Sequence, residues 1–244
     1  MKRFFVFCVL AATAMALLVP AAAFSFPVPE NLQFELAWNG IYAGTSTLSI
    51  SYDQNHNYRI ESTARSADFI SLFYRVRDKA ESLAKQGSFA SIDYKLKTRE
   101  GHHRKDKEVM FPDGAARSDT VYLDRMDKET KNFKTPPGIL DALSSFYFVR
   151  TQPLVVGKSI HVTIFDEKKV WNVEVKVLRK EKVNTWAGSF NTVLIRPLLK
   201  SEGIFRSNGA IYIWLTDDAR HMPVMLESHV KVGSIKAILQ KVKY

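Results

Sequence analysis

Few residues in this 244-residue chain are spaced for chemistry, and histidine comes first because it serves both metal sites and acid–base catalysis. The adjacent pair His102-His103 offers two imidazoles, but neighbouring side chains in a strand or turn point apart and do not easily share one ion. None of the six histidines is spaced four residues from another histidine. We therefore expect no metal site and no cofactor, and we interpret the pair as the solvated tip of a hairpin.

A second pattern of interest is the adjacent pair Asp217 and Asp218, because paired carboxylates can cleave glycosidic bonds. The pair follows an apolar, strand-like segment over residues 211–216, so an Asx-type turn is the simpler interpretation. The chain also lacks the G-x-S-x-G, Walker A, G-x-G-x-x-G and H-E-x-x-H motifs. We expect no enzymatic activity, and hydrolysis of an envelope glycan by these two carboxylates remains an alternative.

A basic segment over residues 95–107 carries six Lys or Arg residues against two acids. The simpler interpretation is the outer face of a hairpin, kept charged for solubility and to protect sheet edges. The alternative is contact with an anionic surface, such as lipid headgroups, lipopolysaccharide or an acidic glycan. Nucleic acid is not an expected partner, because the aromatic residues alternate inward instead of interleaving with the basic ones. The residues expected to make the anionic contact are Lys95, Lys97, Arg99, Arg104 and Lys105.

The first 23 residues have the pattern of a secretory signal peptide. Lys2 and Arg3 precede an apolar run over residues 4–19, and small residues end at Ala23, where we expect cleavage. The run is shorter than the roughly 20 residues of a spanning helix. Cys8 would leave with this leader, and the formal charge would change from +10 to +8, with 33 basic residues against 25 acidic ones. Residues 24–244 are therefore expected to form one exported, periplasmic domain that does not span the membrane.

Apolar and polar residues alternate through most of the chain after the leader. Leu32, Phe34 and Leu36 share one face of an extended segment, and Asn39-Gly40 follows with the residue types of a type I′ hairpin turn. The period-two pattern predicts roughly twelve to fourteen antiparallel strands, each with one face in a core and one in water. The pattern recurs through residues 58–65, 92–97, 171–177 and 224–242.

Two segments depart from this alternation and predict short helices, at residues 67–73 and 139–149. A sheet of so many strands cannot stay flat and open, because its twist makes it curl. The expected fold is therefore all-β, with a large antiparallel sheet curled into an incomplete barrel. The two helices are expected to pack on or cap its concave side, where their apolar residues would contact a ligand. These expected ligand-binding residues are Phe69, Ile70, Phe73, Leu143, Phe146 and Tyr147.

Several segments resemble an exported bacterial family catalogued as domain of unknown function 3108. The resemblance implies a periplasmic, β-rich domain with no assigned activity, and no catalytic residue comes with it. The overall shape is similar to that of periplasmic lipoprotein carriers, whose curled sheet holds acyl chains against helices. The segments that carry the resemblance are 38–44 (WNGIYAG), 74–78 (YRVRD), 186–192 (WAGSFNT), 213–218 (IWLTDD), 223–224 (PV) and 233–237 (GSIKA).

These observations favour a non-enzymatic periplasmic protein that binds a lipid-like or hydrophobic ligand in envelope maintenance. A helix-lined apolar concavity would suit an acyl chain. The alternative is a structural adaptor, whose helices only fill the core and whose basic hairpin docks on an envelope protein or an anionic glycan.

Overall fold

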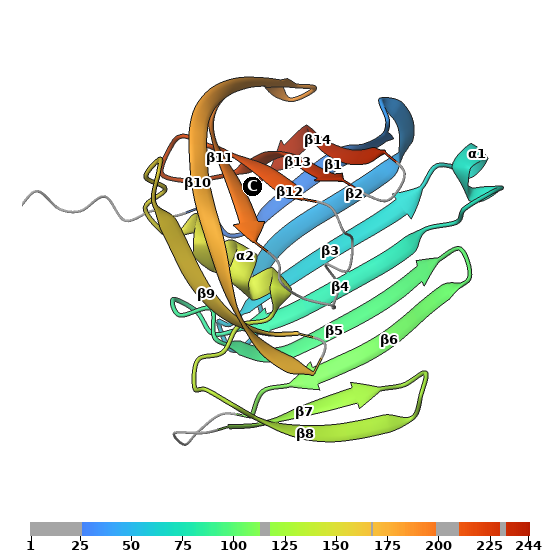
Figure 1. Ribbon diagram of the computed structural model, residues 1–244, viewed down its shortest axis with the longest axis vertical. Helices are drawn as coiled ribbons and strands as arrows, with labels where there is room; N and C mark the ends of the chain where they lie inside the picture. Colours follow the sequence, from blue (N-terminus) through green and yellow to red (C-terminus); the bar gives the residue numbers. More distant parts are fainter. Residues whose placement is uncertain (1–25, 113–117, 167, 199–209, 230–232) are drawn as a thin grey trace, which may run out of the picture.

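A computed structural model describes residues 26–112, 118–166, 168–198, 210–229 and 233–244. The expected signal peptide and Cys8 lie outside these residues. The described chain folds as the sequence predicted, into one antiparallel sheet of fourteen strands that curls nearly into a barrel, with two short helices (Figure 1). The strands are β1 (Glu30–Trp38), β2 (Ile41–Tyr52), β3 (Tyr58–Ser66), β4 (Arg77–Ala84), β5 (Ser91–Glu100), β6 (His103–Met110), β7 (Ser118–Asp124), β8 (Glu129–Thr135), β9 (Ser159–Asp166), β10 (Lys169–Thr185), β11 (Gly188–Leu198), β12 (Ile211–Thr216), β13 (Pro223–His229) and β14 (Ser234–Lys243), and the helices are α1 (Asp68–Ser71) and α2 (Ala142–Arg150).

The sheet consists of two meanders joined side by side. Strands β1 to β8 pair in sequence, strands β9 to β14 pair in sequence, and β1 pairs with β14. The free edges of the sheet are therefore β8 and β9. The short segment before α2 links the two halves, because the Ser91 amide donates to the Ile139 carbonyl at 3.0 Å and the Phe165 amide donates to the Leu140 carbonyl at 2.8 Å. The segment before α2 therefore connects the edge strand β9 to the start of β5.

The first hairpin has the turn that its sequence predicted. Asn39 and Gly40 have φ angles of 49° and 83°, both in the left-handed region that a type I′ turn requires. The Asn39 side chain also connects this turn to the start of β14, because its Oδ1 accepts from the Ser234 amide at 2.9 Å. A Cβ on Gly233 would lie 2.0 Å from the same Oδ1, so only glycine leaves room for this contact.

Helix α2 begins at a buried cap. The Asp141 carboxylate accepts from the amides of Leu143 at 2.8 Å and Ser144 at 3.0 Å, which is the usual arrangement at a helix N-terminus. It also accepts from the hydroxyls of Ser82 at 2.7 Å and Ser91 at 2.6 Å. Burial raises the pKa of Asp141, while these hydrogen bonds favour its charged form. The cap therefore fixes the start of α2 against β4 and β5.

The other end of α2 is held by a buried ion pair. Arg150 donates to both carboxylate oxygens of Glu30, at 2.7 and 2.9 Å, and both side chains are fully buried. Arg150 Nε donates to the His221 carbonyl at 3.0 Å, and the guanidinium carbon lies 4.3 Å from the centre of the Phe26 ring. These contacts join α2 to the start of β1 and to the turn between β12 and β13.

The two helices differ in their surroundings. Helix α2 packs on the concave side, as expected, and starts at Ala142 instead of residue 139 because Ile139 and Leu140 pair in extended conformation. Helix α1 has only four residues and lies at the rim of the sheet, in the connection from β3 to β4 (Figure 1). It covers none of the core: Phe73, just after it, is 90% exposed. The helical spacing of residues 67–73 therefore marks a corner of the chain and not a helix on the concave side.

Candidate functional site

A cavity of about 750 Å³ lies between α2 and the inner face of the curled sheet. Its volume falls within the roughly 300–1,000 Å³ that is usual for small-molecule sites. Helix α2 forms one side of the cavity and strands β9 to β12 form another, and the residues that line both sides are mostly apolar. The apolar lining includes Leu143, Phe146 and Val149 from α2, and Val162, Ile164, Val173, Val175, Ile195 and Ile213 from the strands.

Polar groups gather at one end of this cavity, where β4 begins, β5 ends and β6 begins. The lining residues there include Asp78, Glu100, His103 and Lys105. The register of the β5–β6 hairpin explains why three of them face inward. Glu100 pairs with His103 and Thr98 pairs with Lys105, so all of these residues share the face of buried Leu96. We refer to Asp78, Glu100, His103 and Lys105 as the polar mouth of the cavity.

Two carboxyl groups of the polar mouth are neighbours. Burial raises the pKa of Glu100 to about 7, and the negative charge of Asp78 and a hydrogen bond to it act in the same direction, whereas Lys105 acts in the opposite direction. Asp78 Oδ1 in turn accepts from the Arg99 amide at 2.9 Å. The Glu100 carboxyl group therefore keeps its proton up to near neutral pH and bonds to Asp78. The carboxyl oxygens that this bond leaves over can accept hydrogen bonds from a ligand, and the Lys105 ammonium group can donate them.

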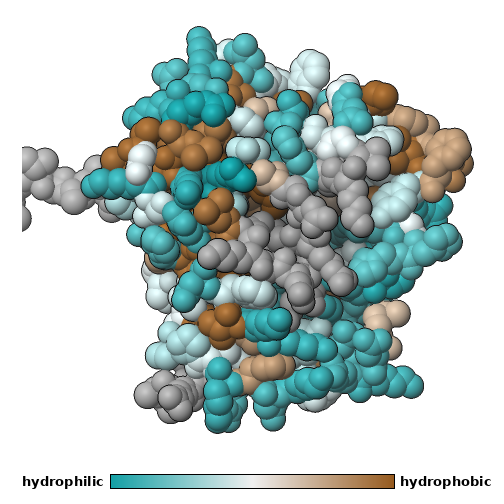
Figure 2. All heavy atoms as spheres, in the orientation of Figure 1, coloured by the Kyte–Doolittle hydropathy of each residue, from teal (hydrophilic) through white to brown (hydrophobic). Residues whose placement is uncertain are grey.

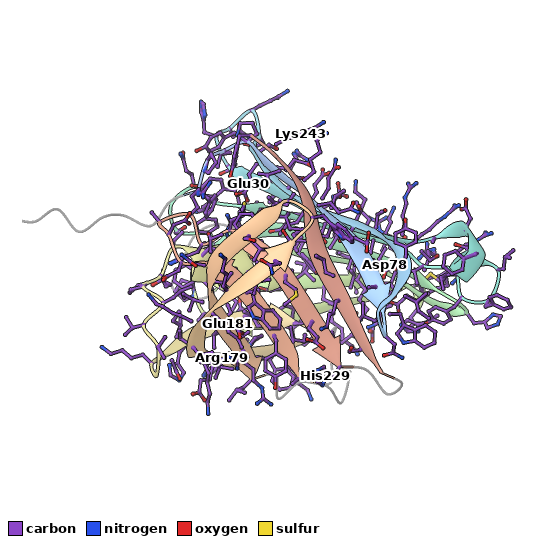
Figure 3. All side chains as sticks on the ribbon, turned by 90° about the horizontal axis from the view of Figure 1, so that it is seen from above. Glu30, Asp78, Arg179, Glu181, His229 and Lys243 are labelled. Carbon is purple, nitrogen blue, oxygen red and sulfur yellow. The ribbon has the colours of Figure 1, made fainter. Side chains whose placement is uncertain are left out.

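The part of the cavity next to α2 is held in place by the buried contacts of that helix. Along β5, the inward positions run from Ser91, which bonds to the buried Asp141, through apolar Leu96 to Glu100 at the mouth. Figure 3 shows Glu30 of the buried ion pair and Asp78 of the polar mouth at separate places in the molecule. The arrangement is an apolar chamber with one polar end.

The chemistry that this arrangement supports is binding. The apolar walls suit a hydrocarbon group, and the polar mouth suits a headgroup that forms hydrogen bonds. Within the described residues, no three His, Asp, Glu or Cys side chains are grouped to hold a metal ion. Neither of the two described helices is long and apolar enough to cross a membrane.

The expected ligand-binding residues divide into two groups. Leu143 and Phe146 line the cavity, and Tyr147 lies behind them, fully buried against Phe26 and the Arg150 guanidinium. The three residues expected from the first helical segment do not reach the cavity. Phe69, Ile70 and Phe73 lie at the rim with α1, where Phe69 is 48% exposed.

The residues expected to contact an anionic surface lie on both faces of the β5–β6 hairpin. Lys95, Lys97, Arg99 and Arg104 take the outward register positions, whereas Lys105 faces the cavity. Acids accompany two of the outward residues: Lys95 Nζ lies 3.0 Å from Glu108, and Arg99 Nη2 lies 4.0 Å from Asp106. This outer face therefore carries charges of both signs.

The other sequence candidates lie in turns. Asp218 Oδ1 accepts from the Thr216 hydroxyl at 2.7 Å and the Arg220 amide at 3.0 Å, and Asp217 forms an ion pair with Lys180 at 2.7 Å. Neither carboxylate lines the cavity. The pair His102-His103 lies at the β5–β6 turn, and only His103 reaches the cavity wall.

Sequence reasoning missed the carboxyl pair of the polar mouth. The available signal was an acid at an inward position: Asp78 follows Tyr74 and Val76 in the apolar phase, and Glu100 follows Tyr94 and Leu96. A charged residue in the apolar phase of a half-buried strand is unusual. It indicates either the end of the core or a functional position.

Comparison with solved structures supports the barrel-like fold. The crystal structure of a beta-barrel-like DUF1849 protein from Brucella abortus matches with a TM-score of 0.56 at 14% sequence identity, covering 88% of this chain and 97% of that one. Weaker matches are a presumed exported protein with a YmcC-like fold from Bacteroides fragilis (TM-score 0.37, 11% identity, 91% of this chain and 99% of that one) and a presumed lipoprotein from Parabacteroides distasonis (TM-score 0.34, 11% identity, 90% and 97%).

No curated protein matches this sequence. A protein family does: residues 33–240 match the family described as "Protein of unknown function (DUF3108)". This match spans the sheet from β1 into β14, together with both helices and the cavity between them. The chain therefore belongs to the DUF3108 family.

Proposed function

We propose that this protein binds a lipid-like ligand in its cavity, as a non-enzymatic component of the bacterial cell envelope. The observation that carries the proposal is the cavity of about 750 Å³, whose walls are apolar and whose one polar end carries Asp78, Glu100 and Lys105. An amphiphile has the same division, with a hydrocarbon part that gains from leaving water and a headgroup that keeps its hydrogen bonds.

The polar mouth limits the headgroups that fit. The carboxyl oxygens of Asp78 and Glu100 offer hydrogen-bond acceptors, and the Lys105 ammonium group offers donors and a positive charge. A hydroxyl, amide or phosphate-linked group would find partners there, whereas a wholly apolar ligand would displace water from these polar groups without replacing its hydrogen bonds. The proposed ligand is therefore an acyl-chain amphiphile and not a simple hydrocarbon.

The cellular site of this function is expected to be the periplasm. The basic start, apolar run and small residues of positions 1–23 have the order of a secretory signal peptide. Two of the similar solved structures are described as an exported protein and a lipoprotein, each presumed. A periplasmic protein meets both leaflets that face this compartment, where acyl-chain ligands are abundant.

The test begins with the protein purified from a periplasmic fraction. Native mass spectrometry and solvent extraction should find a bound amphiphile, and a fluorescent fatty acid should bind to the delipidated protein. The substitution Ala80→Trp places an indole on the cavity wall and should weaken binding of the fluorescent fatty acid at least about tenfold by removing its space. Lys97→Trp, on the outward face of the neighbouring strand, is the matched control and should bind normally.

Two results would contradict the proposal. One is a protein that is consistently empty and whose melting temperature does not change with fatty acids or phospholipids. The other is equal binding by the Ala80→Trp and Lys97→Trp variants, because the probe would then lie outside the cavity.

A further inference from the structure

Large apolar side chains project into solvent at the end of the sheet that carries α1. Leu72 is 81% exposed and Phe73 is 90% exposed, values far above those of apolar residues in a core. Figure 2 shows apolar side chains gathered at this end of the molecule. We call this surface the α1 rim, and it consists of Trp38, Ile41, Tyr42, Phe69, Leu72 and Phe73.

The exposure of the α1 rim is built into the fold. The Ala67 amide donates to the Ala43 carbonyl at 2.8 Å, which joins the connection holding α1 to the beginning of β2. The Ser66 and Ser71 hydroxyls bond to each other at 2.7 Å, and Ser66 Oγ accepts from the Val76 amide at 2.9 Å. The backbone therefore presents these apolar side chains outward in a defined position, and a patch of this kind marks an interaction site.

Positive charge surrounds the α1 rim. Arg65 and Arg77 lie directly opposite each other on β3 and β4, and Arg75 lies two residues from Arg77 on the same face. All three are exposed, and none forms an ion pair with another described residue. Over residues 65–77 these three arginines stand against one acid, Asp68. Like charges opposite each other on paired strands repel, and an anionic partner would relieve this repulsion.

The α1 rim borders the polar mouth of the cavity. Arg77 directly precedes Asp78, and the Tyr74 ring packs on Gly101, next to Glu100. A Cβ on Gly101 would lie 2.7 Å from Tyr74 Cε2, which shows how closely the ring covers this turn. Whatever binds the α1 rim therefore comes close to the cavity entrance.

We propose that the α1 rim docks on an anionic phospholipid surface, with its apolar side chains among the headgroups and Arg65, Arg75 and Arg77 against lipid phosphates. Apolar and aromatic side chains next to basic ones are the combination that binds membrane interfaces. Peptide partners usually need an open strand edge or a groove, whereas these side chains project from turns and a four-residue helix. The docking does not depend on what the cavity holds.

Vesicle co-sedimentation of the purified exported protein tests this proposal. The protein should bind vesicles of phosphatidylcholine with about one third phosphatidylglycerol, and bind pure phosphatidylcholine much less. The double substitution Leu72→Ser with Phe73→Ser should lower the vesicle-bound fraction about tenfold, and Arg75→Gln with Arg77→Gln should remove the preference for anionic vesicles. Trp186→Ser is the matched control, because Trp186 is 69% exposed at the β10–β11 turn and does not belong to the α1 rim, and it should bind vesicles normally.

Other outcomes overturn the proposal. Equal vesicle binding by the Trp186→Ser control and the Leu72→Ser, Phe73→Ser variant would place the contact elsewhere. Absence of vesicle binding, together with a concentration-dependent dimer that this double variant abolishes, would assign the rim to a second copy of the chain. The cavity-filled Ala80→Trp variant should still bind vesicles, so failure of docking and failure of ligand binding are distinguishable.

Discussion

The raised pKa of Glu100 in the polar mouth should make the protein less stable as pH rises, and substitution of Glu100 should remove this pH dependence. Glu100 has a pKa of about 7 in the folded protein against 4.5 in the unfolded chain. Replacement by glutamine keeps the shape and the hydrogen-bonding capacity of the protonated carboxyl group but cannot ionise. The variant Glu100→Gln should therefore resemble the wild type in acid and exceed its stability above neutral pH.

The sign follows from proton linkage. Below pH 4.5 Glu100 is protonated in both states, and its contribution does not change with pH. Between pH 4.5 and 7 the folded state keeps a proton that the unfolded chain releases, so stability falls as pH rises. Above pH 7 Glu100 is ionised in both states, and the folded protein carries the full free-energy cost of its buried charge. At about 1.4 kcal/mol for each pH unit between the two pKa values, this cost is at most about 3.5 kcal/mol.

Urea denaturation at pH 5 and pH 8 measures the effect. Glu100→Gln should match the wild type within about 1 kcal/mol at pH 5 and be more stable by about 2–3 kcal/mol at pH 8. Other buried acids such as Asp93 and Asp141, whose pKa values burial raises, titrate in both proteins and cancel in the difference.

Glu81→Gln is the matched control for this experiment. Glu81 lies on the adjoining strand, and a hydrogen bond from Lys79 lowers its pKa below 4.5. It is therefore ionised at both pH 5 and pH 8, and its substitution should change stability equally at the two pH values. The reasoning is refuted if Glu100→Gln also shows the same difference from wild type at pH 5 and pH 8.

Three further predictions concern stability. Arg150→Met should destabilise the protein by about 3–5 kcal/mol, because it leaves the buried Glu30 carboxylate unpaired, and urea denaturation measures this loss. Asp141→Ala should cost about 2–4 kcal/mol in the same assay, through the lost helix cap and the buried hydroxyls left without their acceptor. Leu72→Ser with Phe73→Ser should change the free energy of unfolding by less than about 0.5 kcal/mol, and an unchanged melting curve would check that these side chains contact solvent in the free protein.

The strand pattern was predictable because a curled sheet has one packed face and one wet face throughout. Inward residues such as Leu32, Ile60 and Leu96 are buried where the alternation placed them. The Asn39-Gly40 turn was predictable for a local reason, since few residue types accept two positive φ angles in succession. These features depend on residues that are near one another in sequence.

The site was only partly predictable, because it depends on pairings between distant segments. Glu30 and Arg150 are 120 residues apart, and nothing near either residue indicates the other. The position of the first helix was misjudged for the same reason. The spacing of Phe69 and Phe73 indicates a helical turn, but whether a neighbouring element covers that turn depends on where β3 and β4 end within the sheet. The carboxyl pair likewise requires the register that places the start of β4 beside the end of β5.

The placement of these groups gives the cavity a direction. The Asp141 cap and the Glu30–Arg150 pair are buried at the two ends of α2, and removing either leaves a polar group without a partner. The part of the cavity next to α2 therefore resists opening. The polar end carries a carboxyl pair whose ionisation near pH 7 lowers stability, next to apolar side chains that water already reaches. Local opening is least costly there. A ligand would enter and leave between the polar mouth and the α1 rim, which is the surface that we propose faces the membrane.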